Sequence, residues 1–97
     1  MNIMFSALSN YPERYYIVLR KIHNTGSITR KDLYSFFGGN SCGLVNRVIF
    51  SMSNSKHIAV LEDNSTDITY RITEKGFKYL QELEMKVNLD KLSHFMN

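Results

Sequence analysis

Two apolar patterns of helical spacing, interrupted by a pair of glycines, constrain the fold of this chain more than any other feature. They lie in the stretch SITRKDLYSFFGGNSCGLVNRVIFSM, residues 27–52, where Gly38 and Gly39 separate them. Two residues without a β-carbon bend a chain sharply at little steric cost. The stretch predicts a helix from about residue 30, with Thr29 and Asp32 in a capping box at its start, and a second helix over about 41–53. The second helix has one apolar face, with Leu44, Val45, Val48, Ile49 and Met52, and one more polar face, with Cys42, Asn46, Arg47, Phe50 and Ser51.

A further helix precedes this pair. Asn10 can accept hydrogen bonds from free amide groups at a helix start, and Pro12 suits the first helical turn, where its missing N–H costs nothing. Apolar residues then recur at helical spacing until Gly26, which permits the left-handed turn that ends many helices. The pattern therefore predicts a helix over about 11–24.

The second half of the chain changes period. In IAVLEDNSTDITYRI, residues 58–72, apolar and β-branched residues flank a polar tip. This arrangement predicts a β-hairpin with a five-residue loop at 63–67. Thr73, bracketed by Ile72 and Phe77, then predicts the N-cap of a last helix, whose apolar positions run on to Val87.

Length and composition indicate one globular domain. The chain has 97 residues, of which 43% are hydrophobic and 22% charged, and a chain of this size can build a single compact core. Its apolar runs are shorter than the roughly 18 residues of a membrane span, and its start lacks the basic and apolar regions of a secretory signal. The single cysteine, Cys42, cannot form an internal disulfide. We expect a cytoplasmic protein with no membrane partner.

The order helix, helix, turn, helix, hairpin, helix resembles the winged helix-turn-helix superfamily. The segment YRITEKGFKYLQEL, residues 70–83, is similar to the second wing strand and following helix of its MarR-, PadR- and ArsR-like transcription regulators. The resemblance implies an α+β, mainly α fold with three helices, a β-hairpin wing and a C-terminal helix over 11–87. Residues 1–10 would form an N-terminal arm or short helix, and residues 88–97 a C-terminal extension.

The same resemblance implies sequence-specific binding of double-stranded DNA as a small transcriptional regulator. The helix at about 41–53 would lie in the major groove. There an arginine can bind guanine through two hydrogen bonds and an asparagine can pair in a similar way with adenine. Base contacts are therefore expected from Asn46 and Arg47, and contacts to phosphate groups from Arg30, Lys31, Asn40, Ser41, Lys56 and Arg71.

Charge supports this expectation in one region and opposes it in another. The net charge of +3 divides into +5 for residues 1–57, with seven basic and two acidic residues, and −2 for residues 58–97, with five basic and seven acidic. The expected wing tip holds Glu62, Asp63 and Asp67 and no basic residue, whereas contact with the minor groove favours Arg or Lys. The alternative is a winged-helix protein–protein interaction module that does not bind DNA.

The sequence gives few indications of a catalytic or metal site. His23, His57 and His94 are far apart and lack the spacing of metal ligands. The Gly38–Gly39 pair does not belong to a phosphate-binding motif, and Asp32 is better explained as a helix cap than as a general base. We expect a protein without enzymatic activity, catalytic residues, metal or cofactor. Whether a small-molecule effector binds is left open.

Apolar residues at both ends of the chain suggest a second subunit. A domain of this size has little use for them unless they cover each other or a partner. The resemblance implies a homodimer formed through terminal helices, which would place two DNA-reading helices about one turn of DNA apart. The alternative is that both ends fold back onto the core of their own chain. The residues concerned are Phe5, Leu8, Leu89, Leu92 and Phe95.

Overall fold

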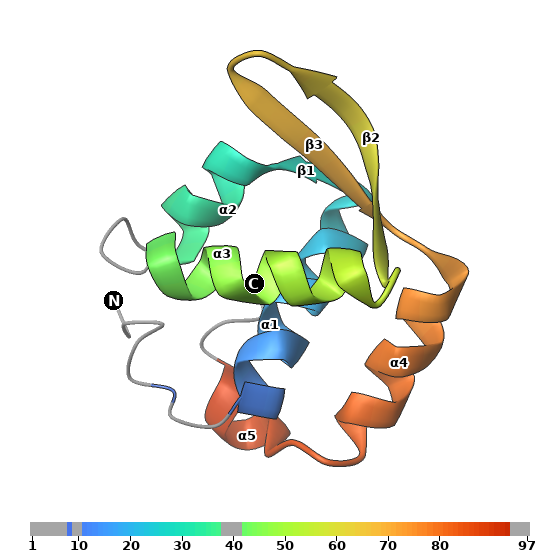
Figure 1. Ribbon diagram of the computed structural model, residues 1–97. Coiled ribbons are helices and arrows are strands. Elements are labelled where there is room, and N and C mark those ends of the chain that lie inside the picture. The colour runs from blue at the N-terminus through green and yellow to red at the C-terminus, as the bar shows by residue number, and fades with distance from the viewer. Residues whose placement is uncertain (1–7, 9–10, 38–41, 94–97) are drawn as a thin grey trace.

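The protein is a small, mainly helical α+β fold with a three-stranded antiparallel sheet (Figure 1). The structure, a computed structural model, describes Leu8 and residues 11–37 and 42–93. The turn at Gly38–Gly39, the candidate phosphate contacts Asn40 and Ser41, and Phe5 and Phe95 lie outside these residues. The elements in order are α1 (Tyr11–Thr25), β1 (Ser27–Thr29), α2 (Arg30–Phe37), α3 (Cys42–Asn54), β2 (Ile58–Asn64), β3 (Asp67–Ile72), α4 (Glu74–Glu84) and α5 (Leu89–Leu92).

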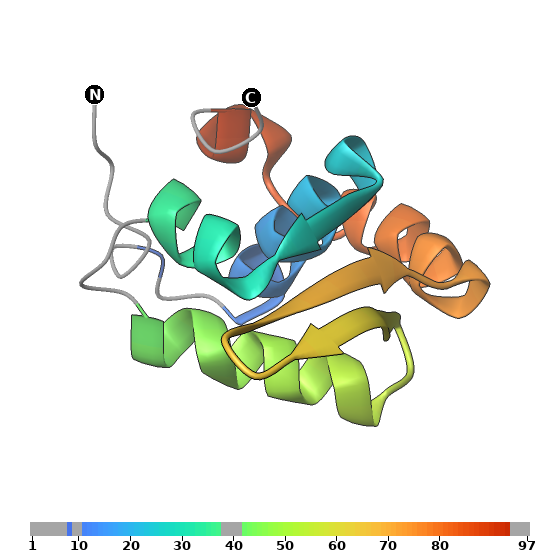
Figure 2. The same cartoon turned by 90° about the horizontal axis from the view of Figure 1, so that it is seen from above.

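Helix α1 is the centre of the fold. It contacts α3, α4, β1 and β3, and Figure 2 shows it between α3 on one side and α5 on the other. Contact on several sides explains why the helix buries an unbroken run of residues, Tyr15 to Leu19, together with Ile22. The prediction of a helix over about 11–24 is confirmed, and Gly26 follows it with a left-handed φ of 81°.

The sheet has the strand order β1-β3-β2, so β3 lies between the other two strands. Ile28 of β1 pairs with Tyr70 of β3, which also pairs with Val60 of β2. Strand β1 was not predicted, because three residues are too few to show an alternating pattern and only their pairing with β3 defines the strand. The long hairpin β2–β3 projects beyond the helices as a wing (Figure 1).

The turn of the wing is shorter than predicted. The strands pair as far as Asn64 and Asp67, so two residues connect them and not five. The cause is the side chain of Asn64, whose Oδ1 accepts hydrogen bonds from the N–H groups of Thr66 and Asp67 at 3.1 and 3.0 Å. A side chain that bonds to the backbone two or three residues later tightens a turn. The polar tip therefore belongs largely to the strands.

The predicted helix starts at Thr29 and Thr73 are confirmed by their hydrogen bonds. Thr29 Oγ1 accepts from the N–H of Asp32 at 3.1 Å, and Thr73 Oγ1 accepts from the N–H of Gly76 at 3.0 Å. Each bond satisfies an amide group that has no partner within its helix. The two caps fix where α2 and α4 leave the sheet.

The C-terminal part differs from prediction in one respect. Helix α4 ends at Glu84 and does not run to Val87, because the N–H of Met85 turns back to the carbonyl of Glu82. Helix α5 then places Leu92, which has no exposed surface, in the same hydrophobic core as Leu8. Within the described residues, none of the helices combines the length and the apolar character that crossing a membrane requires.

Candidate nucleic-acid interface

Helix α3 turns one face to the core and the other to the surroundings. The buried face consists of Val45, Val48, Ile49 and Met52, as predicted from their spacing. The opposite face exposes Asn46, Arg47 and Phe50. Figures 1 and 2 show α3 along one side of the molecule, with no other described element over its outer face. The two side chains predicted to contact bases are therefore accessible.

A contact from α2 orients one of these side chains. The hydroxyl of Tyr34 donates to Oδ1 of Asn46 at 3.2 Å. Tyr34 is half-buried between α2 and α3, so it has less freedom than a surface side chain. With its oxygen held in this way, Asn46 presents its amide NH₂ as a donor. Sequence analysis missed this role of Tyr34, because the two residues are twelve positions apart on different helices.

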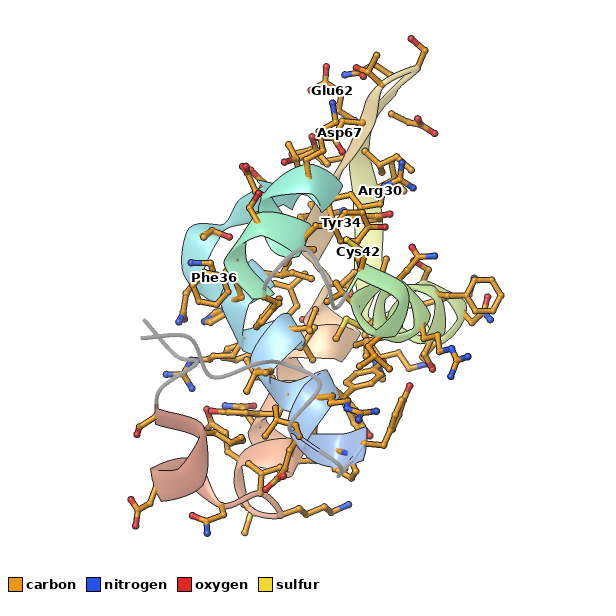
Figure 3. The ribbon with its side chains drawn as sticks, turned by 90° about the vertical axis from the view of Figure 1, so that its left-hand side faces the viewer. Arg30, Tyr34, Phe36, Cys42, Glu62 and Asp67 are labelled. Atoms are coloured by element: carbon orange, nitrogen blue, oxygen red, sulfur yellow. The ribbon has the colours of Figure 1, made fainter. Side chains whose placement is uncertain are left out.

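The start of α2 carries two more predicted contact residues, Arg30 and Lys31. Lys31 is exposed and Arg30 is half-buried. Figure 3 shows Arg30 and Tyr34 on the side of α2 next to the wing and α3, whereas Phe36 lies on the other side of α2. The structure therefore brings Arg30 and Lys31 to the same end of the molecule as the wing, beside the face that holds Asn46.

A carboxylate of the wing lies against this start of α2. Oδ1 of Asp67 accepts from the N–H groups of Ile68 at 2.8 Å and Lys31 at 3.4 Å. Desolvation raises the pKa of Asp67, but these hydrogen bonds and the charge of Lys31 outweigh it and hold the pKa below its ordinary value. Asp67 thus acts as an anionic cap for α2. Its negative charge therefore stabilises the start of α2 in the same chain, a role that could not be predicted from the sequence.

The remaining part of the wing is acidic and apolar. Glu62 and Asp63 are exposed on β2, next to Val60 and Leu61, which are 54% and 56% exposed. Leu61 is the extra residue at a register shift between Val60 and Glu62. The predicted contact residues Lys56 and Arg71 lie at the base of the wing, where both are exposed. The basic residues predicted to contact DNA thus lie on α2, on α3 and at the base of the wing, away from its tip.

The base of the wing is anchored by His57, a residue that sequence analysis considered only as an unlikely metal ligand. The hydroxyl of Tyr15 and Nδ1 of His57 are 2.6 Å apart, and the imidazole stacks on Tyr79 with ring centroids 4.4 Å apart. The backbone carbonyl of His57 accepts from the N–H of Thr73 at 3.0 Å. One residue therefore ties α1, the wing and α4 together, and so fixes the wing relative to α3.

Burial changes the pKa values of His57 and Tyr15. Desolvation is the main cause that lowers the pKa of His57, Lys75 lowers it further and Glu82 opposes the shift. Burial also raises the pKa of the Tyr15 hydroxyl well above its ordinary value. Burial therefore favours the neutral imidazole, whose Nδ1 shares one hydrogen bond with the hydroxyl of Tyr15.

The three described residues predicted for dimerisation, Leu8, Leu89 and Leu92, do not form one exposed surface. Leu8 and Leu92 are 3% and 0% exposed and belong to the core of their own chain. Leu89 is 40% exposed, and Met85 nearby in sequence is 89% exposed. For the described part of the two ends, the alternative of folding back onto the core agrees with these positions. Of the described apolar residues in this C-terminal part, Met85 and Leu89 remain exposed.

Among residues 8, 11–37 and 42–93 no cluster of three His, Cys, Asp or Glu side chains could hold a metal ion. The ion pair between Arg20 and Glu84, which also contacts the hydroxyl of Tyr16, links α1 to α4. An open groove between α1 and α2 holds Lys21, whose Nζ lies 3.8 Å from the centre of the Phe36 ring.

Comparison with known proteins gives no match to a protein family, to a curated protein sequence or to a solved structure.

Proposed function

We propose that this protein binds double-stranded DNA through the outer face of α3 and acts as a small transcriptional regulator with a winged-helix fold. The observation that carries the proposal is the composition of that face. It presents Asn46 and Arg47 to the surroundings, and the whole of α3 contains no acidic residue. The fold is compatible with this reading: β1 lies between α1 and α2 in sequence and pairs with the wing strand β3.

The dimensions of α3 suit the major groove. A helix of 13 residues is about 20 Å long, and the groove, roughly 12 Å wide, admits one helix with its side chains. Arg47 would bind guanine O6 and N7 through its two-pronged guanidinium group. Asn46, whose oxygen is engaged by Tyr34, would donate from its NH₂ group to a base acceptor.

Phosphate contacts would position the helix. Arg30 and Lys31 at the start of α2 and Lys56 beyond the end of α3 flank the face that reads bases. Arg71, on β3 at the base of the wing, would add a further contact. The acidic tip of the wing would remain outside the complex, because Glu62 and Asp63 would be repelled by phosphate groups.

Two further parts of this proposal concern assembly and location. A cytoplasmic homodimer would present two copies of α3 to a palindromic site. In view of the burial of Leu8 and Leu92, its contact would be the surface around Met85 and Leu89. Light scattering of the wild-type chain and of Met85→Glu tests this part: the variant should be monomeric where the wild type is dimeric.

The DNA proposal is tested by fluorescence anisotropy of a labelled mixed-sequence duplex at several salt concentrations. Binding that weakens steeply with salt is expected, because contacts to phosphate release counterions. On a selected binding site, Arg47→Ala should cost about 1 to 3 kcal/mol of binding free energy and relax the preference for one base. Lys78→Ala removes one positive charge from an exposed position on α4 and is the matched control.

The second candidate function is a protein–protein interaction module. It is favoured by the wing, where the edge strand β2 exposes Val60 and Leu61 beside the acidic Glu62 and Asp63. The anisotropy titration separates the two candidates. Absence of duplex binding even at low salt would exclude DNA binding and leave the wing as the leading contact surface.

A further inference from the structure

Phe50 is the most exposed of the described aromatic side chains. It is 68% exposed, compared with 47% for Tyr11, 39% for Phe77 and 36% for Phe36. The other three each contact another side chain: Tyr11 lies against Tyr15, Phe77 against His23, and Phe36 under Lys21. Within the described part of the chain, Phe50 makes no ring contact. Its phenyl ring is therefore available for a contact with another molecule.

The position of Phe50 on α3 places it among the candidate base contacts. Residues three and four apart are neighbours on a helix surface, so Phe50 lies one turn after both Asn46 and Arg47. Gly43 lies on the same stripe, two turns before Phe50. It is exposed, and a β-carbon there would meet nothing within 4 Å. The stripe therefore has no side chain at Gly43 and a projecting phenyl ring at Phe50, with the polar side chains of Asn46 and Arg47 between them.

The charge of this helix identifies the kind of partner. Arg47 is the sole charged residue of α3, and the basic pair Arg30 and Lys31 begins the neighbouring α2. The outer face of α3 has a cation and no carboxylate, which favours a polyanion over an acidic or neutral protein surface. Double-stranded DNA fits both the charge and the width of the helix.

We propose that Phe50 reads the methyl group of a thymine in the major groove, an inference that rests on the proposed function. A phenyl ring has neither donor nor acceptor for the polar edges of the bases. The thymine methyl is the one apolar group that the major groove offers to it. Gly43, without a side chain, allows the duplex to approach the other end of the stripe closely.

The helix geometry also predicts where that thymine lies. From Arg47 to Phe50 the helix rises about 4.5 Å, and base pairs are stacked about 3.4 Å apart. The thymine should therefore lie one or two base pairs from the guanine that Arg47 contacts. A guanine and a thymine at this spacing are the expected signature of the preferred site.

The test replaces single thymines with deoxyuridine, which removes the methyl group and leaves base pairing intact. A site is first selected with the wild-type protein from duplexes with a randomised centre. Each thymine of that site is then replaced in turn, and affinities are measured for the wild type, for Phe50→Ala and for the control Phe77→Ala on α4. Circular dichroism melting checks that each variant is folded. Because Phe50 is largely exposed, we expect its replacement to leave the fold intact.

One replacement should weaken wild-type and Phe77→Ala binding about fourfold, the value of one buried methyl group, and leave Phe50→Ala binding unchanged. If the wild type and Phe50→Ala respond alike to every replacement, the thymine contact is wrong while DNA binding stands. If no duplex binds and no site is enriched, both this inference and the proposed function fail. A loss of affinity in Phe50→Ala without any response to deoxyuridine would assign Phe50 to another contact.

Discussion

Two glycines of this protein occupy opposite environments. At Gly76, in the first turn of α4, an added β-carbon would overlap the backbone carbonyl of His57 and lie 2.9 Å from Cγ1 of Ile72. At Gly43, in the first turn of α3, an added β-carbon would meet nothing within 4 Å. The packing of the chain thus explains Gly76 and gives no reason for Gly43. Gly76 therefore marks a region where close packing requires glycine, and Gly43 marks a surface that is open to a partner.

The contacts around each glycine agree with this division. Near Gly76, the base of the wing is held by the Tyr15–His57 hydrogen bond, the stacking on Tyr79 and the Thr73 cap. Near Gly43, the hydrogen bond from Tyr34 to Asn46 reaches the outer face of α3 from a neighbouring helix of the described chain. Substitutions near Gly76 should change stability, whereas those near Gly43 should change binding.

The largest effect is expected for Gly76→Ala. Because the β-carbon would collide with backbone, which cannot rotate away, the substitution should lower the free energy of unfolding by about 3 kcal/mol or more. Urea denaturation followed by circular dichroism measures this loss. Lys75→Ala, the preceding residue on the same turn and exposed, is the control and should change stability little. An unaltered midpoint for Gly76→Ala would mean that α4 does not approach the wing this closely.

The second prediction concerns pH. The unfolded chain binds a proton at His57 near the ordinary pKa of 6.5, whereas burial lowers the pKa in the folded chain. Below about pH 6.5 the unfolded state therefore binds more protons, and the free energy of unfolding falls as the pH falls. His57→Gln should remove this dependence at a cost of about 1 kcal/mol near pH 7.5, from lost stacking on Tyr79.

The control for the pH prediction is His23→Gln, at an exposed position near the end of α1. It should retain the fall in stability between pH 7 and pH 5 that the wild type shows. Equal curves for the wild type and His57→Gln would show that other groups cause the dependence. Tyr15 does not titrate in this range, because burial raises the pKa of its hydroxyl.

Local patterns in the sequence predicted most of the helices, because periodicity and caps act over a few residues. The inward face of α3 and the Thr29 and Thr73 caps are confirmed. Strand β1 and the two-residue turn of the wing were missed, since both depend on pairing or on one side-chain hydrogen bond. The close approach at Gly76 likewise depends on a distant segment, the backbone of His57.

The candidate site likewise has features that the sequence predicts and features that it does not. That Asn46 and Arg47 face outward follows from helical spacing, but the contact of Tyr34 with Asn46 depends on how two helices meet. The roles of His57 and Asp67 likewise require distant segments to come together. For Leu8 and Leu92 the sequence did not decide whether a second subunit or the chain itself buries them, because the hydrophobic effect is not directional.

A third, smaller effect is expected at Lys56, which has a left-handed φ of 62° after the end of α3. The N–H groups of Lys56 and His57 return to the carbonyls of Ser53 and Met52 at 3.1 and 2.9 Å, a turn that favours glycine. Lys56→Gly should therefore raise the free energy of unfolding by about 1 kcal/mol. Lys56→Ala, which loses the charge and keeps the strained backbone, should give no such gain.

The two Lys56 variants also sharpen the binding proposal. If Lys56 contacts phosphate, both should weaken duplex binding to the same extent and reduce its salt dependence by about one counterion. Stability and affinity would then move in opposite directions in Lys56→Gly. Unchanged affinity in both variants would remove Lys56 from the interface and leave Arg30, Lys31 and Arg47 as its cations.

The smallest effect on stability is expected for Gly43→Ala, and it bears most directly on the comparison of the two glycines. Alanine loses less conformational freedom than glycine in a helix and would find open space at this position, so stability should rise by about 0.5 kcal/mol. If a duplex approaches α3 closely here, the added methyl group should at the same time weaken DNA binding. A variant that is more stable and binds less tightly would show that Gly43 serves the interface. A variant that is more stable and binds equally well would place the closest approach of the DNA further along α3, toward Phe50.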